Sequence, residues 1–380
     1  MRVLVDATAI PADRGGVGRY LDSVLPAIAD LGVDLVVACQ QRDAETTSAL
    51  LPRAEVVPVR PMVARRSARV AWEQVGLPRL VRRARAQVLH SPHYTMPLRC
   101  SVPVVVTLHD ATFFSHPEVH TALKRRFFRA WTRLAARSAA ALVVPSHATA
   151  REVVRFVGAD PARFYVAHHG VDPGIFHPAS EAEVARVRHT LGLDGRYVAF
   201  LGTLEPRKNV RALVRAWVSV SAADPAPAAL VLAGAPGWDD ELEAVVRSVP
   251  AHLRLLRTGY LPLGDLAGYL AGAEVVAYPS LGEGFGLPVL EAMACGATVL
   301  TTRELALPEV GGDAVAYCGI EDADIAAVLR DLLLDPDRRA ALGDAARARS
   351  AGFTWEAAAR VHVAAYERAA GAGCERRPNE

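Results

Sequence analysis

Short apolar runs recur along the chain, separated by longer segments whose apolar positions follow helical spacing. Runs of four to seven apolar residues are typical of buried strands. They predict ten strands, at residues 2–7, 33–39, 87–90, 102–108, 139–145, 197–201, 229–233, 254–258, 274–279 and 298–302. Regular alternation of strand and helix predicts an α/β fold with doubly wound parallel sheets.

The alternation is interrupted once and then restarts. Pro173, Gly174 and Pro178 mark the interruption with residues that favour linkers. A chain of 380 residues is long enough for two domains, each with its own core. We expect a first domain over residues 1–171, a second over 172–352, and a C-terminal segment over 353–380. Further helices are expected at about 322–334, 336–350 and 355–370.

The segment GEGFGLPVLEAMACG, residues 282–296, concentrates the candidate chemistry. It follows an expected strand, contains Gly284 and Gly286, and continues into a helix that opens at Pro288. Backbone N–H groups at such a helix start favour an anion. Glu283 lies in the loop and Glu291 in the apolar helix, where a carboxylate needs a partner. The spacing alone leaves two readings equally open, an ordinary paired glutamate and a ligand-binding carboxylate.

Three further segments follow expected strands, where ligands bind open α/β sheets. Gly15 and Gly16 come after the first strand, although on their spacing alone a tight turn explains them better. His109 ends the strand at 102–108, and a lone histidine is more often structural. The sequence GTLEPRKN, residues 202–209, places Arg207 and Lys208 after a strand, where basic side chains can meet phosphates.

Charge is distributed unevenly although the formal net charge is only +2. Residues 1–175 contain 23 Lys and Arg against 14 Asp and Glu, whereas the remainder is acidic. Nine arginines fall within residues 53–85, and the basic helix expected at 123–138 aligns Leu123, Phe127, Trp131 and Leu134 on one side. Residues 53–85 are interpreted either as a solvated helical face or as a basic surface for phosphate or lipid headgroups. The helix at 123–138 is interpreted either as a domain helix that packs its aromatic side on the core or as an interfacial membrane helix.

Cysteine usage and apolar run lengths bear on location. The five cysteines are odd in number and scattered, which fits a reduced, cytosolic setting. We expect no signal peptide and no bilayer-spanning segment. The sequence therefore favours a cytoplasmic protein, with peripheral attachment to the inner face of the cell membrane as the alternative.

The segment Glu283-Gly284-Phe285-Gly286, with Glu291 eight residues after the first glutamate, resembles the E-x-F-G-x-x-x-x-E signature of family 4 retaining glycosyltransferases. That resemblance implies a GT-B fold, in which two Rossmann-like domains face each other across a cleft. It implies that residues 1–171 form the acceptor-side domain and residues 172–352 the domain that binds the nucleotide sugar. The family's first glutamate and the following amides hold the donor sugar, and its second glutamate holds the nucleotide ribose. By resemblance these roles fall on Glu283, Phe285, Gly286, Leu287 and Glu291.

The resemblance extends to the other segments. It implies that His109 reaches the donor hexose, that Gly15 and Gly16 border the cleft near the diphosphate and the acceptor, and that Lys208 contacts the diphosphate. The family's arginine after Gly202 is replaced here by Thr203, and Arg207 is the nearest substitute. His169 stands where the family usually has asparagine. The last helix resembles the one that crosses back to the first domain.

The expected activity is therefore retaining transfer of a hexose from a nucleoside-diphosphate sugar. The form of these motifs resembles bacterial mannosyl- and rhamnosyltransferases, which favours GDP-mannose over UDP- and dTDP-sugars. The acceptor is a hydroxyl of a glycan, glycolipid or small molecule. The alternative is a catalytically silent nucleotide-sugar binder or scaffold of the same fold.

Other chemistries are weighed against this reading. Asp322-Ala323-Asp324 mimics a D-x-D metal motif but lies in an expected helix, so a solvated face is favoured. The sequence has no zinc-type Cys/His cluster and no G-x-S-x-G element. It also lacks any recognised nucleic-acid motif. Neither a metal nor a cofactor is expected, and the donor's diphosphate would be stabilised by protein cations and amides.

Overall fold

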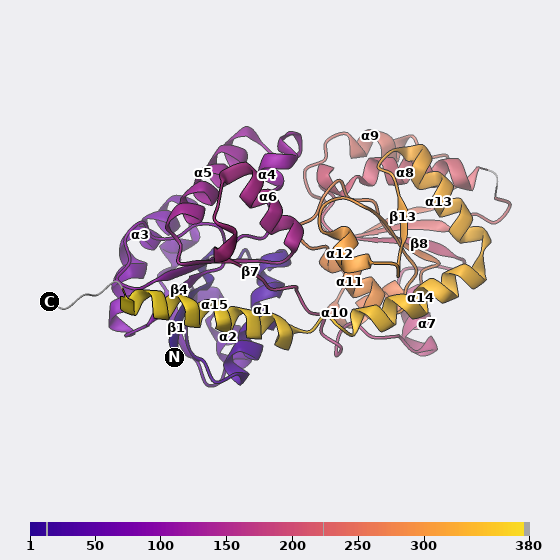
Figure 1. The fold of residues 1–380 in the computed structure, drawn as a ribbon. Helices are drawn as coiled ribbons and strands as arrows, with labels where there is room; N and C mark the ends of the chain where they lie inside the picture. The colour runs from indigo at the N-terminus through magenta and orange to yellow at the C-terminus, as the bar shows by residue number, and fades with distance from the viewer. Residues whose placement is uncertain (13, 223, 376–380) are drawn as a thin grey trace. The chain divides into compact units, whose positions relative to one another are not determined.

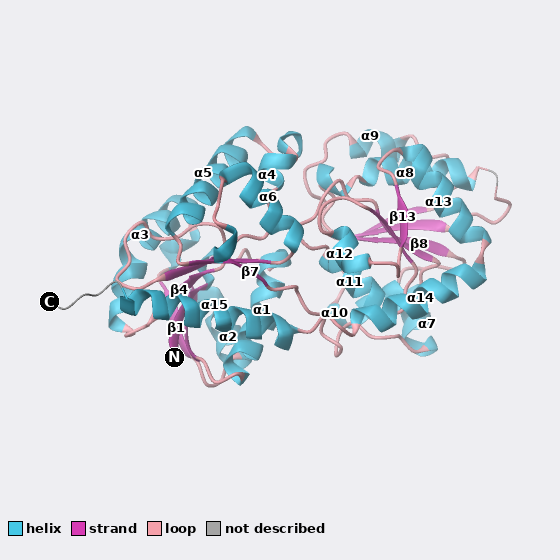
Figure 2. Cartoon of the chain, viewed as in Figure 1, coloured by secondary structure: helices cyan, strands magenta, loops and turns pink. Residues whose placement is uncertain are grey.

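A computed structural model describes residues 1–12, 14–222 and 224–375 (Figure 1). The chain divides into two compact units. The first comprises Met1–Gly170 together with the chain from Thr354 onward, and the second comprises Val171–Phe353. Each unit is an α/β structure built on its own parallel sheet (Figure 2).

The first unit contains seven parallel strands in the order β3-β2-β1-β4-β5-β6-β7. Their bounds are Arg2–Asp6 (β1), Asp34–Gln40 (β2), Glu55–Val59 (β3), Val88–Ser91 (β4), Val104–Thr107 (β5), Ala141–Val144 (β6) and Phe164–Val166 (β7). The apolar pattern predicts five of these strands and misses the two at the sheet edges. The missed strand β3 contains Pro58, and β7 has only three residues, so neither forms a long apolar run.

Alternate residues of each central strand face opposite helical layers. Val3 and Val5 of β1 pack in one core with α1 (Gly15–Asp30) and α15 (Trp355–Glu375). Leu4 packs in a second core on the other side, with α3 (Arg66–Arg83), α5 (Ala122–Ser138) and α6 (His147–Val157). The shorter helices α2 (Ala44–Leu50) and α4 (Thr112–Ser115) complete the unit. The last helix therefore belongs to the core of the unit that begins the chain.

A buried chain of hydrogen bonds ties α15 to this sheet. His362 Nδ1 donates to the carbonyl oxygen one turn earlier, 2.7 Å away, so its Nε2 accepts from the Tyr20 hydroxyl at 2.6 Å. Thr107 Oγ1 lies 3.3 Å from that hydroxyl and 2.8 Å from His90 Nε2. His90 Nδ1 lies 2.9 Å from the Tyr366 hydroxyl, which returns the chain to α15. Burial lowers the pKa of both imidazoles, so they stay neutral and can each accept a bond.

The chain passes from one unit to the other after Gly170 and again after Phe353, and the two crossing segments contact each other. Val171 N donates to Phe353 O at 3.2 Å. A Cβ added at Gly170 would meet the backbone nitrogen of Trp355 at 2.2 Å, so only glycine fits that approach. His169 stacks on the Trp355 indole with ring centroids 5.6 Å apart.

The buried face of α5 differs from the predicted one. Leu123, expected on the packed side, is 80% exposed. The face that contacts the core instead contains Phe128, Trp131, Thr132 and Ala135. Small residues allow the helix to approach the sheet closely, so packing follows Thr132 and Ala135 and turns the large Leu123 outward. Of the predicted stripe, Trp131 packs against the core, whereas the prediction for Leu123 is wrong.

The second unit contains six parallel strands in the order β10-β9-β8-β11-β12-β13. Their bounds are Tyr197–Leu201 (β8), Ala229–Ala233 (β9), Leu255–Gly259 (β10), Val275–Tyr278 (β11), Val299–Thr302 (β12) and Ala316–Cys318 (β13). The helices are α7 (Glu181–Thr190), α8 (Val210–Ser221), α9 (Leu242–Arg247), α10 (Leu263–Ala271), α11 (Leu287–Ala294), α12 (Leu307–Gly311), α13 (Asp322–Leu334) and α14 (Pro336–Ser350). The predicted helices at 322–334 and 336–350 are confirmed, and strand β13 was missed.

Each sheet has one place where the strand order reverses, and ligands bind open α/β sheets beside such a point. In the first unit it lies between β1 and β4, and in the second between β8 and β11. Parallel pairing of β8 with β11 brings their carboxyl ends to one edge. The loops that leave those two ends are the GTLEPRKN and GEGFG segments, so the second sheet brings the two predicted motifs together.

Candidate active site

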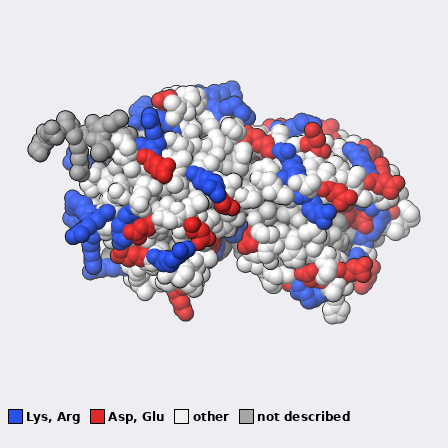
Figure 3. Space-filling view, turned by 60° about the horizontal axis from the view of Figure 1, so that its bottom comes forward, with Lys and Arg blue, Asp and Glu red and all other residues white. Residues whose placement is uncertain are grey.

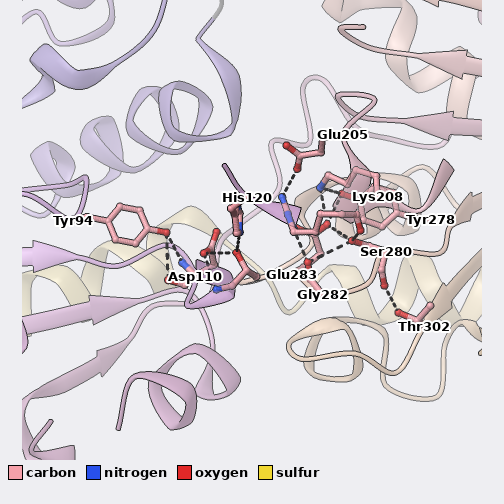
Figure 4. A network of polar contacts seen from close by, with 12 residues as sticks. Tyr94, Asp110, His120, Glu205, Lys208, Tyr278, Ser280, Gly282, Glu283 and Thr302 are labelled. Atoms are coloured by element: carbon pink, nitrogen blue, oxygen red, sulfur yellow. Dashed lines mark hydrogen bonds and ion pairs between the residues drawn. The ribbon is translucent and has the colours of Figure 1, made fainter. Parts of the chain in front are cut away.

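A buried carboxylate organises the reversal point of the second unit (Figure 4). Glu283 Oε1 accepts from Lys208 Nζ at 2.6 Å, from Ser280 Oγ at 2.7 Å and from the Tyr278 hydroxyl at 3.0 Å. The Arg207 guanidinium forms an ion pair with the other oxygen, Oε2. Glu283 is only 7% exposed, so both its oxygens are held inside the protein.

The loops that carry these side chains are tied to one another through their backbones. Leu281 N donates to Arg207 O at 2.8 Å, and Arg207 Nη1 donates to Gly282 O at 2.7 Å. Ser280 Oγ also lies 3.0 Å from Arg207 O, and Thr302 at the end of β12 donates to Ser280 O at 2.6 Å. The geometry around Glu283 therefore depends on three neighbouring strands.

Close backbone contact positions the loop that precedes Arg207. A Cβ at Gly234 would lie 2.1 Å from Gly202 O, and a Cβ at Gly237 would lie 2.1 Å from Leu204 O. Gly202 itself has φ +154°, which side-chain-bearing residues rarely adopt. Leu204 N also donates to Ala235 O at 2.9 Å. The loop after β8 is thus seated on the loop after β9, and Thr203 lies half-buried between these contacts.

Two cations and two carboxylates balance in this cluster. Arg207 Nη2 donates to Glu205 Oε1 at 2.7 Å while its other nitrogen holds Glu283. Burial raises the pKa of Glu283, but Arg207 and Lys208 outweigh it and lower that pKa to about 2. Burial and the neighbouring Arg207 charge lower the pKa of Lys208, against the opposing effect of Glu283. Glu283 therefore stays ionised throughout the neutral range and anchors both basic side chains.

The glycine loop and the helix after it have the predicted form. Gly286 has φ +99°, and α11 begins at Leu287 with Pro288 in its first turn. A Cβ at Gly286 would also approach Leu307 to 2.8 Å, so the backbone here requires glycine. Phe285 is buried, with its ring 6.0 Å from that of Phe353. Glu291 is 4% exposed on the buried side of α11. Burial, followed by the charge of Glu291, raises the pKa of the Cys295 thiol.

His109 follows β5 in the first unit and is held in one orientation. Its Nε2 donates to Pro92 O at 2.7 Å, so the neutral ring keeps Nδ1 as a hydrogen-bond acceptor. Burial lowers its pKa. The next residue, Asp110, is braced because its amide donates to the Tyr94 hydroxyl at 2.9 Å and its carboxylate accepts from Thr112 (Figure 4).

The predicted site residues thus fall into two groups. In the second unit the structure joins Arg207, Lys208 and Glu283 directly, while Gly202, Thr203, Phe285, Gly286, Leu287 and Glu291 lie in the adjoining loops and helix. In the first unit, Gly15 and Gly16 form the opening turn of α1. Sequence reasoning missed Glu205, Tyr278 and Ser280. Tyr278 and Ser280 bond to Glu283, and Glu205 binds Arg207. All three lie in or beside the predicted segments, but only the strand order shows which side chains they contact.

Asp322, the first residue of the D-x-D-like segment, forms an ion pair with Arg215. Arg215 Nε donates to Asp322 at 2.6 Å across the packed helices α8 and α13. Within the described ranges, no group of three or more His, Cys, Asp or Glu side chains is placed to hold a metal ion. In the same ranges, no helix has both the length and the apolar character needed to cross a bilayer.

Comparison with known proteins identifies both halves. Residues 14–174 match the model described as Glycosyltransferase Family 4, and residues 182–349 match Glycosyl transferases group 1. The chain is 32% identical over 286 residues to O-antigen chain mannosyltransferase B of Escherichia coli, covering 74% of each protein. It is 33% identical over 247 residues to D-inositol 3-phosphate glycosyltransferase of Kineococcus radiotolerans, covering 60% of this chain and 57% of that one.

Solved structures share the fold at low sequence identity. Sucrose-phosphate synthase of Thermosynechococcus elongatus has a TM-score of 0.81 at 19% identity, covering 98% of this chain and 100% of that one. Anabaena HepE in complex with UDP-glucose has a TM-score of 0.75 at 18% identity, covering 99% and 100%. WaaG, a glycosyltransferase involved in lipopolysaccharide biosynthesis, has a TM-score of 0.75 at 17% identity, covering 96% and 98%. The chain is therefore a glycosyltransferase of GT-B fold and belongs to glycosyltransferase family 4.

Proposed function

We propose that this nucleotide-sugar glycosyltransferase transfers a hexose with retention of anomeric configuration, without a metal ion, and with GDP-mannose as its best donor. The acceptor would be a hydroxyl of a glycan, glycolipid or small molecule. The observation that carries the proposal is the Glu283 cluster, which fixes Lys208 and Arg207 beside the glycine loop that opens α11. The mannosyltransferase name of the E. coli relative supports the choice of sugar.

In this reaction the site must stabilise the diphosphate that leaves the sugar. Charge develops on the diphosphate as the glycosidic bond breaks, and preorganised donors lower the barrier most when they need not reorient. Lys208 is already held by Glu283 and Tyr278, and the amides at the start of α11 point along the helix dipole. In this proposal a phosphate oxygen takes the acceptor's proton, so no carboxylate pair is needed.

A donor screen tests the proposal. The protein is incubated with GDP-mannose, UDP-glucose, UDP-galactose, UDP-N-acetylglucosamine and dTDP-rhamnose, and release of nucleoside diphosphate is measured. GDP-mannose should be cleaved fastest, and NMR of an acceptor product should show the donor's anomeric configuration. Binding of nucleotide sugars without cleavage or transfer would instead support a silent binder of the same fold. An inverted product would overturn retention.

Glu291 should contribute to nucleotide affinity. If its buried carboxylate accepts from the ribose hydroxyls, Glu291→Ala should weaken nucleoside-diphosphate binding by about 1.5–3 kcal/mol, the range for hydrogen bonds to charged groups. Isothermal titration with GDP and UDP measures this change. The exposed Glu321→Ala is the matched control and should bind as the wild type does. Unchanged affinity in folded Glu291→Ala would remove this residue from the site.

Activity should persist in excess EDTA. Charge compensation is assigned to Lys208, Arg207 and backbone amides, and these do not depend on a divalent ion. Turnover of the preferred donor is measured before and after dialysis against EDTA, and again after adding Mg²⁺ or Mn²⁺. A loss of turnover that either metal restores would contradict the proposal.

The basic surface of the first unit is proposed to contact anionic lipid. On α5, Leu123, Arg126 and Arg137 are exposed. Figure 3 shows further groups of Lys and Arg side chains on the surface of the first unit. Each basic residue near an anionic surface contributes on the order of 1 kcal/mol, an attraction that salt screens. The neighbouring arginines Arg129 and Arg133 lie over the Phe114 ring instead.

Co-sedimentation with phosphatidylglycerol vesicles tests this surface. The double variant Arg126→Glu with Arg137→Glu should bind at least about tenfold more weakly at low salt, since it reverses two charges. Arg247→Glu with Arg330→Glu, two exposed positions of the second unit, is the matched control. Equal binding of wild type to neutral and anionic vesicles would refute the lipid proposal.

A further inference from the structure

Tyr278 ends β11 at the reversal point of the second sheet and is held on several sides. It is 1% exposed, and its ring stacks on that of Phe200 in the paired strand β8, with centroids 5.8 Å apart. Thr301 Oγ1 of β12 donates to its backbone oxygen at 2.8 Å. A Cβ added at Gly202 would approach the same ring to 3.7 Å. The tyrosine is thus fixed by both neighbouring strands and lies against the loop that follows β8.

The Tyr278 hydroxyl lies between two opposite charges (Figure 4). It donates to Glu283 Oε1 at 3.0 Å and accepts from Lys208 Nζ. The same Nζ lies 4.9 Å from the centroid of the tyrosine ring, a distance at which an ammonium is attracted to an aromatic face. Burial and the charge of Glu283 raise the pKa of Tyr278, so the hydroxyl keeps the proton that it donates. A neutral hydroxyl can therefore serve the carboxylate and the ammonium at once.

These contacts determine where the Lys208 ammonium directs its remaining hydrogen. An ammonium has three N–H donors. Among the residues that the structure describes, Lys208 Nζ donates to Glu283 and to Tyr278 and to no third group. Lys208 is only 8% exposed, so its third N–H is largely withdrawn from water. Because the N–H bonds of an ammonium have a fixed tetrahedral arrangement, two occupied directions fix the third.

The carboxylate by itself would hold the ammonium less firmly. A lysine side chain is flexible, and one hydrogen bond leaves its ammonium free to rotate about that contact. Glu283 is also shared with other donors, since Ser280 Oγ donates to Oε1 at 2.7 Å and Arg207 pairs with Oε2. The tyrosine hydroxyl supplies a second acceptor, on a side chain that the sheet already holds in place.

We propose that Tyr278 is a positioning residue for catalysis, whose hydroxyl orients Lys208 so that the third N–H of the ammonium meets the departing diphosphate. This inference rests on the proposed function, in which Lys208 stabilises that diphosphate. Tyr278 acts through the lysine and does not itself contact the reacting atoms. Because a donor that need not reorient lowers the barrier most, loss of the hydroxyl should reduce kcat more than nucleotide affinity.

Tyr278→Phe tests the proposal in the whole protein, because it removes the hydroxyl and keeps the ring that packs on Phe200. With the nucleotide sugar that is cleaved fastest, kcat should fall at least about tenfold, while affinity for GDP and UDP should change less than about twofold. Tyr197→Phe is the matched control, since Tyr197 is a fully buried tyrosine of the same sheet whose hydroxyl donates to Tyr269 O at 2.6 Å. Both variants should unfold at a lower temperature, but the control should keep the wild-type kcat.

A double variant shows whether the tyrosine acts through the lysine. In a Lys208→Ala background, Tyr278→Phe should change kcat less than about twofold, because the cation that the hydroxyl orients is gone. Wild-type kcat in the single variant Tyr278→Phe would overturn the inference, and so would a full additional loss in the double variant. Normal turnover by Lys208→Ala would instead refute the proposed function, since Lys208 would then not stabilise the diphosphate.

The pH dependence of kcat gives an independent readout. Removing an oxygen that accepts from an ammonium destabilises its charged form, so the pKa of Lys208 should fall in Tyr278→Phe. Burial and the charge of Arg207 already lower that pKa, against the opposing effects of Glu283 and Glu205. The basic limb of the profile should therefore move to lower pH in Tyr278→Phe and stay in place in the control. An unshifted basic limb would overturn the inference.

Discussion

Glu283→Gln is expected to lower turnover by at least about 10³-fold. This loss is larger than that for removing one electrostatic stabiliser, because Arg207 and Lys208 both lose the carboxylate that holds them. Arg207 and Lys208 both bind this carboxylate, and their side chains are only 15% and 10% exposed. Breaking a buried ion pair by removing one partner costs about 3–5 kcal/mol. The variant should therefore also unfold at a lower temperature, and both quantities are measurable by donor hydrolysis and calorimetry.

The control and the pH dependence make this prediction specific. Glu321→Gln alters an exposed glutamate of the same unit and should leave both quantities unchanged. The pKa of Glu283 is about 2 in the folded protein against an ordinary 4.5, so its stabilisation is complete above pH 4.5 and decreases as the pH falls toward 2. The stability difference between wild type and Glu283→Gln should be constant from pH 6 to 9. Near-normal turnover in the variant would show that Glu283 does not organise the site.

Lys208→Ala and Arg207→Ala should both impair catalysis, the first by about 10³-fold and the second by about 10²-fold in kcat, the range seen when one electrostatic stabiliser is lost. Lys208 is the motif-matched cation, and Arg207 is proposed to compensate for Thr203, which brings no charge. Because the leaving diphosphate gains charge only as the bond breaks, kcat should fall more than nucleotide affinity. Single-turnover kinetics and titration with GDP separate the two effects.

The structure adds a condition to the role of Arg207. Its guanidinium is shared between Glu205 and Glu283. Glu205→Gln should therefore weaken the ion pair at Arg207 Nη2, and the variant should fold and have an altered kcat. The matched control is Arg215→Ala, because Arg215 pairs with Asp322 and is half exposed. If Lys208→Ala is nearly inactive while Arg207→Ala turns over normally, compensation by Arg207 is wrong. The second cation would then have to be sought in Arg14 or Arg19, and Arg14 already pairs with Asp22 and Asp43.

Local patterns in the sequence were sufficient for the fold class and for part of the site. Apolar runs with β-branched residues identified ten strands because a fully buried parallel strand must be apolar on both faces. The Glu283-to-Glu291 segment predicted the local structure correctly, because a glycine loop that runs into a helix is a local property, whereas its assignment to the donor comes from the family resemblance and stays a prediction. The helices at 322–334 and 336–350 could also be predicted from the sequence, because their caps and apolar spacing are local properties.

Only the tertiary structure decided which distant side chains meet. Lys208 and Glu283 are 75 residues apart and come together because β8 pairs with β11, an order that no local pattern encodes. Tyr20 and His362 are 342 residues apart and meet because the last helix packs in the first core. The exposed position of Leu123 likewise followed from close packing at Thr132 and Ala135. Periodicity along a chain specifies helices and strands, whereas strand order and helix docking depend on the free energy of the assembled core, which is a property of residues far apart in sequence.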